Sequence, residues 1–250
     1  MPQRFEVEGA VLLALKNYHD QAVYRQHCPV CIQPLKGCYC PHIQRFDPHI
    51  SFVILIHPIE MRRRIATGRM SYLCLENSYL ISGQDYSDNE LVNALICDSD
   101  RHCVILYPGP DSQNLSLMSE GQRTELVPAG KKLTVFVIDG TWATAKKMMR
   151  ESQNLKTLPQ VCFSPTKPSS FRVRKQPADF CYSTIEAIHQ TIEILGHSRG
   201  FKTARRQHDN LLEVFDLLVE RQLDYLRMSE QKNGAYNSRQ ERKRPVETES

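Results

Sequence analysis

The sequence lacks the motifs of several large enzyme classes. It contains no Gly-x4-Gly-Lys-Ser/Thr segment, no Gly-x-Gly-x-x-Gly after an apolar run and no His-Glu-x-x-His. These absences argue against a P-loop kinase, a Rossmann dehydrogenase and a zincin. The sequence also lacks a run of about eighteen apolar residues, and the apolar segment 11–15 is too short for a secretory signal. We therefore expect a cytoplasmic protein without a membrane segment, whose cysteines are reduced or bound to metal.

The net charge is too small to indicate a binding partner by itself. The 250 residues are 41% hydrophobic and 24% charged, with a net charge of +4. This composition is typical of a soluble protein with a core large enough for one domain or two small ones. A role in nucleic-acid binding therefore depends on where the arginines lie.

Four of the nine cysteines form a C-x2-C-x6-C-x-C pattern. Cys28, Cys31, Cys38 and Cys40 lie within thirteen residues that also contain turn-forming prolines and a glycine. Four thiolates at this spacing suit tetrahedral Zn²⁺, which would hold together a short segment without a core of its own. A redox C-x-x-C and four unconnected thiols are the alternatives. We expect a first domain over residues 1–50, formed by an N-terminal helix and this structural zinc module.

Apolar runs separated by helical patterns predict the fold of the remaining chain. Four segments are expected as strands: 52–56, 103–107, 133–138 and 161–163. Helices are expected from a capping box at 87–90, over 183–196 after a second capping box, and over 210–227. Strands that are apolar throughout indicate an α/β fold with a mostly parallel sheet and helices on both faces. We expect this domain to span 51–228, followed by a disordered tail over 229–250.

The turn that follows the third of these strands is the expected centre of the site. Asp139, Gly140, Thr141 and Trp142 come between an apolar strand and a Lys- and Met-rich helix. In open α/β sheets, ligands bind at the carboxyl ends of strands. The alternative is an ordinary turn in which Asp139 caps the helix and Trp142 packs in the core.

Other strand ends carry charged and polar groups. His57 and Glu60 follow the first strand and precede the basic run 62–64, and further arginines occur over 172–174 and 199–206. His57 could equally be a hydrogen-bonding residue at a strand end. Carboxylate, aromatic and many cationic groups together suit a substrate that is both anionic and aromatic. Nucleic acid with an adenosine-containing cosubstrate fits this description.

Five motifs in this order resemble the DTW-domain family. They are the cysteine pattern, Thr67-Gly68-Arg69, Asp139-Gly140-Thr141-Trp142, the segment 170–174 and the segment 183–187. The resemblance covers about Cys28 to Leu226. It implies a SPOUT-like fold with a trefoil knot. It also implies transfer of the 3-amino-3-carboxypropyl group of S-adenosylmethionine to N3 of a uridine in tRNA, with release of 5′-methylthioadenosine.

The resemblance also implies a donor site in the loops at the strand ends. The residues implied in donor binding are His57, Glu60, Thr67, Gly68, Arg69, Tyr107, Pro108, Gly109, Asp139, Gly140, Thr141, Trp142, Arg172, Ser183, Thr184 and Glu186. The family often has asparagine before Thr-Gly-Arg, whereas this chain has Ala66. A polar contact expected there is therefore missing.

The implied chemistry assigns catalytic roles to Asp139 and Trp142. Uridine N3 is a poor nucleophile until it is deprotonated, and Asp139 is the best candidate for the base. An ordinary aspartate pKa is near 4, so burial beside Trp142 would need to raise it. Arginines 69, 172 and 174 would bind the donor carboxylate or tRNA phosphates. A SPOUT-like methyltransferase and a non-catalytic zinc-bearing RNA-binding module are the alternative functions, and the oligomeric state is left open.

Overall fold

The computed structural model describes residues 26–172 and 181–233. The expected N-terminal helix and residues 234–250 of the expected tail lie outside this range. The first part of that tail was predicted wrongly, since the last helix, α8, runs over Asn210–Asn233. Within the described residues, no helix is long and apolar enough to cross a membrane.

The described residues form one six-stranded sheet in the order β2-β1-β5-β3-β6-β4. All neighbouring strands pair in parallel, which confirms the predicted parallel sheet. The strands are β1 Ser51–Ile56, β2 Tyr79–Ser82, β3 Arg101–Leu106, β4 Gln113–Asn114, β5 Lys132–Asp139 and β6 Gln160–Cys162. The central strand β5 is buried along most of its length because β1 and β3 flank it and helices cover both faces.

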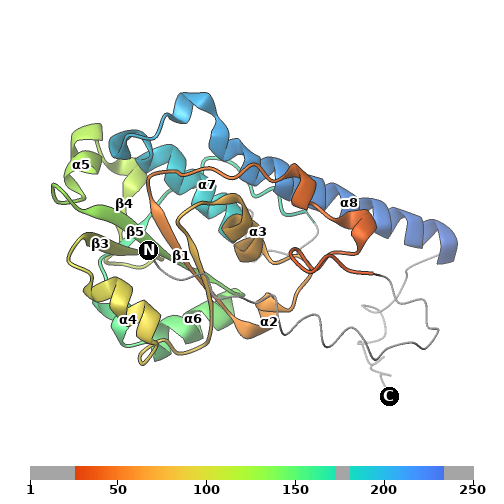
Figure 1. The fold of residues 1–250 in the computed structure, drawn as a ribbon, viewed down its shortest axis with the longest axis horizontal. Coiled ribbons are helices and arrows are strands. Elements are labelled where there is room, and N and C mark those ends of the chain that lie inside the picture. Colours follow the sequence, from red (N-terminus) through yellow and green to blue (C-terminus); the bar gives the residue numbers. More distant parts are fainter. Residues whose placement is uncertain (1–25, 173–180, 234–250) are drawn as a thin grey trace, which may run out of the picture.

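Helices cover both faces of the sheet, as the sequence predicted (Figure 1). The helices are α2 Pro58–Met61, α3 Thr67–Cys74, α4 Glu90–Cys97, α5 Glu120–Glu125, α6 Trp142–Glu151, α7 Thr184–Leu195 and α8. On one face, α3, α7 and α8 pack around Ile188, Ile192 and Phe215. On the other face, α4 and α6 contribute Val92 and Met148 to a second core. Shorter 3-10 turns are η1 Leu35–Gly37, η2 Cys40–His42, η3 Leu115–Leu117, η4 Asn154–Thr157, η5 His197–Arg199, η6 Thr203–Arg205 and η7 Gln207–Asp209.

The register of the sheet brings the functional loops to one edge. Ile56 at the end of β1 pairs with Asp139 at the end of β5, and Leu106 at the end of β3 pairs with Val137. The loops after β1, β3 and β5 therefore begin side by side at the carboxyl edge of the sheet.

Two helix starts differ from the sequence prediction. Helix α4 begins after Asn89, whose side chain accepts a hydrogen bond from the Val92 N–H, and the predicted capping box at Ser87 does not form. Residues Thr67 to Arg69, expected as a loop, are the first turn of α3. No capping side chain precedes that turn, because Ala66 occupies the N-cap position. The usual sequence signal for a helix start is therefore absent there.

Candidate active site

The carboxylate of Asp139 lies at the meeting point of three elements. Asp139 ends β5 and is 5% exposed. Its Oδ2 accepts a hydrogen bond from the Gly68 N–H (3.2 Å), and its Oδ1 accepts one from Thr184 Oγ1 (2.5 Å). Gly68 is in the first turn of α3 and Thr184 is the first residue of α7. The carboxylate is thus held at the N-termini of two helices, where the amide dipoles stabilise a negative charge.

Close packing around Gly68 fixes the carboxylate further. A Cβ atom at position 68 would lie 2.5 Å from Asp139 Oδ2 and 2.9 Å from Ile54 Cγ2. Any side chain there would displace the carboxylate and the Ile54 side chain. The glycine is therefore required by the close approach of α3 to β5.

The helix that follows the turn is capped by Thr141 and not by Asp139. Thr141 Oγ1 accepts a hydrogen bond from the Thr144 N–H (3.2 Å) at the start of α6. Asp139 does contact a helix N-terminus, but that helix is α3. A simple turn that caps its own helix therefore does not describe this arrangement.

A cavity of about 570 Å³ opens at this edge of the sheet. Its volume lies within the range of small-molecule sites. Nine of the residues expected in the donor site line it: Thr67, Tyr107, Pro108, Asp139, Gly140, Thr141, Trp142, Ser183 and Thr184. They come from α3, the loop after β3, the central turn and the start of α7. The structure thus brings together residues that are far apart in the sequence.

Seven other expected residues do not line the cavity. Among the described residues, its lining does not include His57, Glu60, Gly68, Arg69, Gly109, Arg172 or Glu186. His57 caps α2 by accepting a hydrogen bond from the Ile59 N–H (3.2 Å). Its other ring nitrogen lies 3.0 Å from Gln84 Nε2. These contacts match the alternative role of His57, which is that of a hydrogen-bonding residue at the end of a strand.

The charged residues of this group contact other parts of the fold. The Arg69 guanidinium donates to the backbone carbonyls of Arg63 (3.2 Å) and Met61, across the connection between α2 and α3. Glu60 is buried and pairs with Arg63 (3.1 Å). Arg172 pairs with Glu220 on α8. Arg174, the remaining arginine expected near the donor, lies outside the described residues.

Glu186 forms the capping box that the sequence predicted at the start of α7. It accepts hydrogen bonds from the N–H of Ser183 (2.8 Å) and from the N–H of Ser170 (2.7 Å). Ser169 Oγ also donates to its carboxylate (2.7 Å). Glu186 therefore ties the loop before Phe171 to the N-terminus of α7, and both Phe171 and the start of α7 line the cavity.

Trp142 is the first residue of α6 and is 41% exposed. The alternative in which Trp142 packs in the core is therefore wrong. The reason is its position at the N-terminus of a helix at the edge of the sheet, where one side faces solvent. The indole lines the cavity and leaves part of its surface available to a ligand.

Several lining residues were not predicted as part of the site, including Arg63, Phe171 and Tyr182. Phe171 packs edge-on against Phe215 with 5.2 Å between ring centroids. The only sequence signal for these three residues is their position, since each lies within or directly beside a segment that the sequence analysis assigned to the site. With Tyr107 and Trp142, the two rings make the cavity wall strongly aromatic.

Comparison with protein families assigns the chain to a known group. The model of the DTW domain matches residues 25–223. The chain belongs to the DTW-domain family. This match confirms the family resemblance predicted from the motifs.

Curated relatives of this DTW protein carry one name, "tRNA-uridine aminocarboxypropyltransferase 2". The Mus musculus protein is 27% identical over 227 residues, which cover 87% of this chain and 72% of the relative. The Drosophila melanogaster protein is 31% identical over 177 residues, which cover 68% of this chain and 67% of the relative. The Macaca fascicularis protein is 27% identical over 227 residues, which cover 87% of this chain and 72% of the relative. No solved structure gives a significant match.

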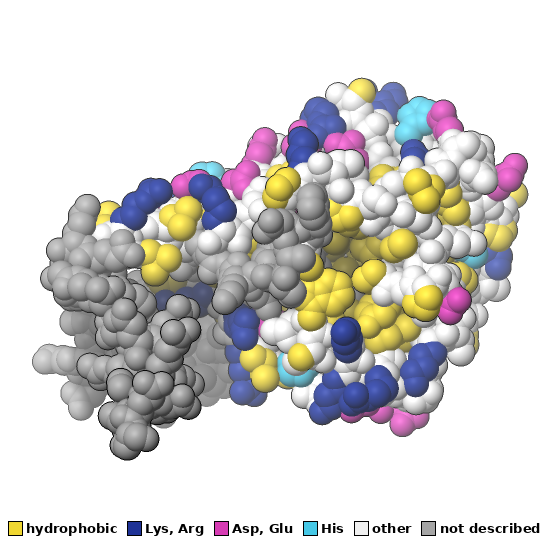
Figure 2. Space-filling view, turned by 180° about the vertical axis from the view of Figure 1, so that it is seen from behind, with side chains coloured by type: hydrophobic (Ala, Val, Ile, Leu, Met, Phe, Trp, Pro, Cys, Tyr) yellow, Lys and Arg dark blue, Asp and Glu magenta, His cyan; other side chains and the backbone are white. Residues whose placement is uncertain are grey.

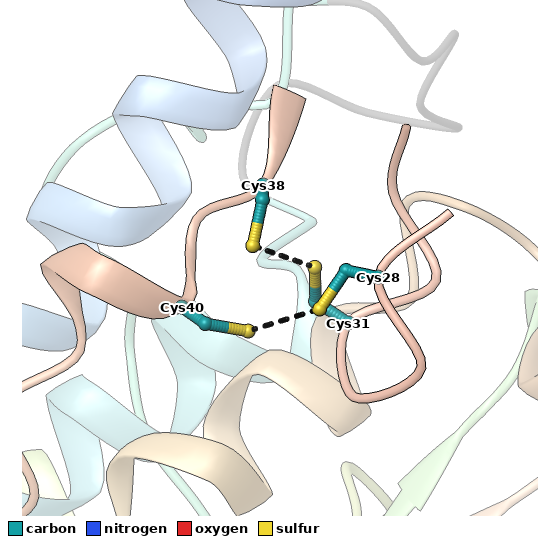
Figure 3. Close-up of side chains that lie close together, drawn as sticks. All are labelled: Cys28, Cys31, Cys38 and Cys40. Atoms are coloured by element: carbon teal, nitrogen blue, oxygen red, sulfur yellow. Dashed lines mark hydrogen bonds between the residues drawn. The ribbon is translucent and has the colours of Figure 1, made fainter. Parts of the chain in front are cut away.

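The cysteine pattern of this DTW protein converges on one point (Figure 3). The Sγ atoms of Cys28, Cys31, Cys38 and Cys40 all lie within 4.8 Å of one another, and all four are free thiols. The Cys28–Cys40 and Cys31–Cys38 pairs are 3.8 Å and 3.7 Å apart. A tetrahedral zinc with Zn–S bonds of about 2.3 Å requires sulfur atoms about 3.8 Å apart. The cluster could therefore hold a metal ion with little rearrangement.

The cluster is attached to the same core as the sheet. Cys28, Cys31 and Tyr39 belong to the buried group that includes Phe52 and Ile54 of β1. A hydrogen bond from the Cys31 backbone lowers the pKa of the Cys28 thiol to about 7, whereas burial raises the pKa of Cys40. A bound cation would favour the thiolate form of all four. Four protein ligands leave no open position, which fits a structural and not a catalytic metal.

Proposed function

We propose that this DTW-domain protein transfers the 3-amino-3-carboxypropyl group of S-adenosylmethionine to N3 of a uridine in tRNA. The observation that carries the proposal is the cavity at the carboxyl edge of the sheet, with Asp139 buried in its wall and aromatic side chains around it. The printed name of the curated relatives supports the same activity. By the family relationship we also propose a SPOUT-like trefoil-knotted topology, with 51–228 as the catalytic part and 1–50 as a zinc-bearing module.

The proposed reaction forms an N–C bond and breaks a C–S bond. Deprotonated N3 attacks the terminal carbon of the aminocarboxypropyl chain, and the sulfonium sulfur keeps the electron pair and leaves as neutral 5′-methylthioadenosine. The proton of N3 is removed by a base, for which Asp139 is our candidate. A sulfonium has three carbons open to attack, so the site must hold the correct carbon in line with N3.

The residues that line the cavity would bind either the donor, S-adenosylmethionine, or the acceptor, a uridine of tRNA. The aromatic side chains of Tyr107, Trp142 and Tyr182 would stack on adenine or uracil. The ionised carboxylate of Asp139 would also attract the positively charged sulfonium. Arg63, whose side chain is 46% exposed and reaches the cavity, would bind the donor carboxylate or a phosphate of tRNA.

The basic residues nearest the cavity form the proposed tRNA surface. Arg62 and Arg64 are exposed beside Arg63, and α6 presents Lys146 and Arg150 from the helix that begins at the cavity. Figure 2 shows apolar side chains gathered in a hollow, with a band of Lys and Arg side chains along one side of it. Such a band would contact phosphates on either side of a uridine that enters the cavity.

The segment 199–206, which the sequence also marked as basic, is a weaker candidate. It follows the C-terminus of α7, whereas the cavity is at the N-terminus of that 12-residue helix, about 18 Å away. Arg199 donates to the backbone carbonyls of Arg123 (3.1 Å) and Thr124 (2.8 Å), and Arg206 pairs with Glu193 and Asp209. Both arginines therefore already have partners within the protein.

The product released from labelled donor and tRNA tests the proposed reaction. We expect 5′-methylthioadenosine. S-adenosylhomocysteine would indicate a methyltransferase, and the absence of both products with intact tRNA binding would indicate a binding module.

A pair of charge variants tests the proposed surface. Arg62→Gln with Arg64→Gln should weaken tRNA binding and reduce its salt dependence by about one unit of slope per lost phosphate contact. Lys202→Gln with Arg205→Gln is the matched control, since it removes the same charge at the far end of α7. If the control weakens binding as much as the first pair, the proposed surface is wrong.

A further inference from the structure

A second group of metal-ligating side chains lies near the end of α7 that is remote from the cavity. His189 and Glu193 are four residues apart on α7 and therefore share one face of the helix. His208 and Asp209 belong to η7, just before α8. One ligand atom from each of the four lies within 4.8 Å of the others.

The distances inside this group are close to those of a tetrahedral site. His189 Nε2 lies 2.9 Å from Asp209 Oδ1. His208 Nε2 lies 3.1 Å from Glu193 Oε1 and 3.9 Å from Asp209 Oδ1. Metal–ligand bonds of about 2.0–2.1 Å place neighbouring ligands about 3.3 Å apart. The observed separations lie on both sides of that value, so small side-chain movements would complete the geometry.

The environment of His208 points to a missing partner. Its side chain is fully buried, and its Nδ1 has no hydrogen-bond partner in the described structure, while its Nε2 faces the carboxylates of Glu193 and Asp209. The ring stacks on His189 with 4.8 Å between centroids, which leaves it beside the other ligand atoms. A buried polar group without a partner is costly, and a bound ion is one of the accepted explanations.

The chemistry of the four side chains also suits a cation. The group offers two imidazole rings and two carboxylates, and each contributes one ligand atom to the cluster. Imidazole nitrogen and carboxylate oxygen are both ligands that Zn²⁺ takes in proteins.

Arg206 now supplies the positive charge of this group. Its guanidinium contacts Glu193 and makes two hydrogen bonds to Asp209, of 2.7 Å and 2.8 Å. Its side chain is 52% exposed, so it can leave toward solvent. Its backbone φ of 55° is in the left-handed region, which is unfavourable for a non-glycine residue. Arg206 would therefore compete with a metal ion but would not block it.

We propose that His189, Glu193, His208 and Asp209 form a second zinc-binding site, distinct from the cysteine cluster. The two carboxylates balance the charge of Zn²⁺, and the mixed imidazole and carboxylate donors match its preferences. Binding would connect α7 to the start of α8 and displace Arg206 to the surface. The role is structural and does not depend on the proposed reaction.

Cobalt binding to the full-length protein tests this site. With the cysteine cluster loaded with zinc, added Co²⁺ should bind at about one equivalent per chain and give weak visible d–d bands. The strong thiolate-to-cobalt charge-transfer band should be absent, because the proposed ligands contain no sulfur. His189→Gln should abolish the d–d bands. If the charge-transfer band accompanies the d–d bands, cobalt has entered the cysteine cluster and the proposal fails.

Two further variants separate a metal site from an ion-pair network. Arg206→Gln removes the competing cation and should raise Co²⁺ affinity by about tenfold, since two exposed ion pairs no longer have to be broken. A network without a metal function predicts no saturable binding in either the native protein or Arg206→Gln, and that result would overturn the proposal. His197→Gln is the control, because His197 is an exposed histidine paired with Glu120. Loss of binding in this control instead of in His189→Gln would show adventitious binding at the surface.

Discussion

The role of Asp139 can be tested by a substitution that the structure should accept. In Asp139→Asn, the amide oxygen can still accept a hydrogen bond from the Gly68 N–H, which lies 3.2 Å from Oδ2 of the native Asp139. The amide NH₂ can donate to Thr184 Oγ1, because a hydroxyl accepts as well as donates. This oxygen lies 2.5 Å from Oδ1 of the native Asp139. Both contacts therefore survive in neutral form, and the variant should fold.

The expected losses of stability and of turnover differ in size. Hydrogen bonds to charged groups contribute about 1.5–3 kcal/mol and neutral ones about 0.5–1.5 kcal/mol. Two such bonds become neutral, so the free energy of unfolding should fall by about 2 kcal/mol. If the carboxylate removes the N3 proton, turnover should fall by about 10²- to 10⁴-fold. A stability loss of that size cannot explain such a fall in a protein that remains folded.

The assay is the rate of 5′-methylthioadenosine release at saturating donor and tRNA, with urea unfolding measured in parallel. The rate of Asp139→Asn should rise with pH, because hydroxide can then deprotonate uridine. Thr184→Val is the matched control, since it removes the hydroxyl contact to Asp139 and keeps the charge. Equal loss in both variants, or an unchanged turnover in Asp139→Asn with weakened donor binding, would refute the role as base. Asp139 would then be a positioning residue for α3 and α7.

Three further predictions concern the parts that surround this carboxylate. Gly68→Ala should lower turnover and destabilise the fold by about 1–3 kcal/mol through overpacking, whereas Gly37→Ala, with open space around its Cβ position, should leave both unchanged. Trp142→Ala should weaken donor or tRNA binding by about 1–3 kcal/mol through lost stacking, with a smaller change in thermal stability because the indole is 41% exposed; a stability loss that exceeds the binding loss would contradict this. Cys38→Ser should lose the metal of the cysteine cluster in elemental analysis, while Cys74→Ser, a buried thiol in the core, should retain it.

The central strands were predictable from the sequence because burial on both faces leaves a simple pattern. Strands β1, β3 and β5 are apolar runs, and the structure buries most of their residues. No such pattern marks β2, a half-buried strand next to β1, or the two-residue strand β4. Helix α3 was missed because Ala66 gives no capping signal and Gly68 weakens helix propensity. Its glycine is explained only by the contact with Asp139, which lies 71 residues away in the chain.

The site residues were predictable as a set but not in their individual roles. The C-x2-C-x6-C-x-C spacing is local, so the sequence alone places four thiols within reach of one ion. His57, Arg69 and Glu186 were expected to bind the donor, and their described contacts are to loops and helix ends. A sequence motif does not distinguish a residue that binds a ligand from a residue that holds the binding loop in place. Only the contacts separate the two.

The contacts of Asp139 connect three of the motifs that the sequence of this chain contains. Gly68 and Thr184 lie 71 and 45 residues from Asp139, yet both donate to its carboxylate. Glu186, two residues after Thr184, fixes the start of α7 and the loop at Ser170. A change in any one of these motifs therefore moves the carboxylate relative to the cavity, even when the changed residue touches no ligand. Loss of activity in a single variant cannot identify a catalytic group here, and pairs such as Asp139→Asn with Thr184→Val, which separate the charge from its support, are required.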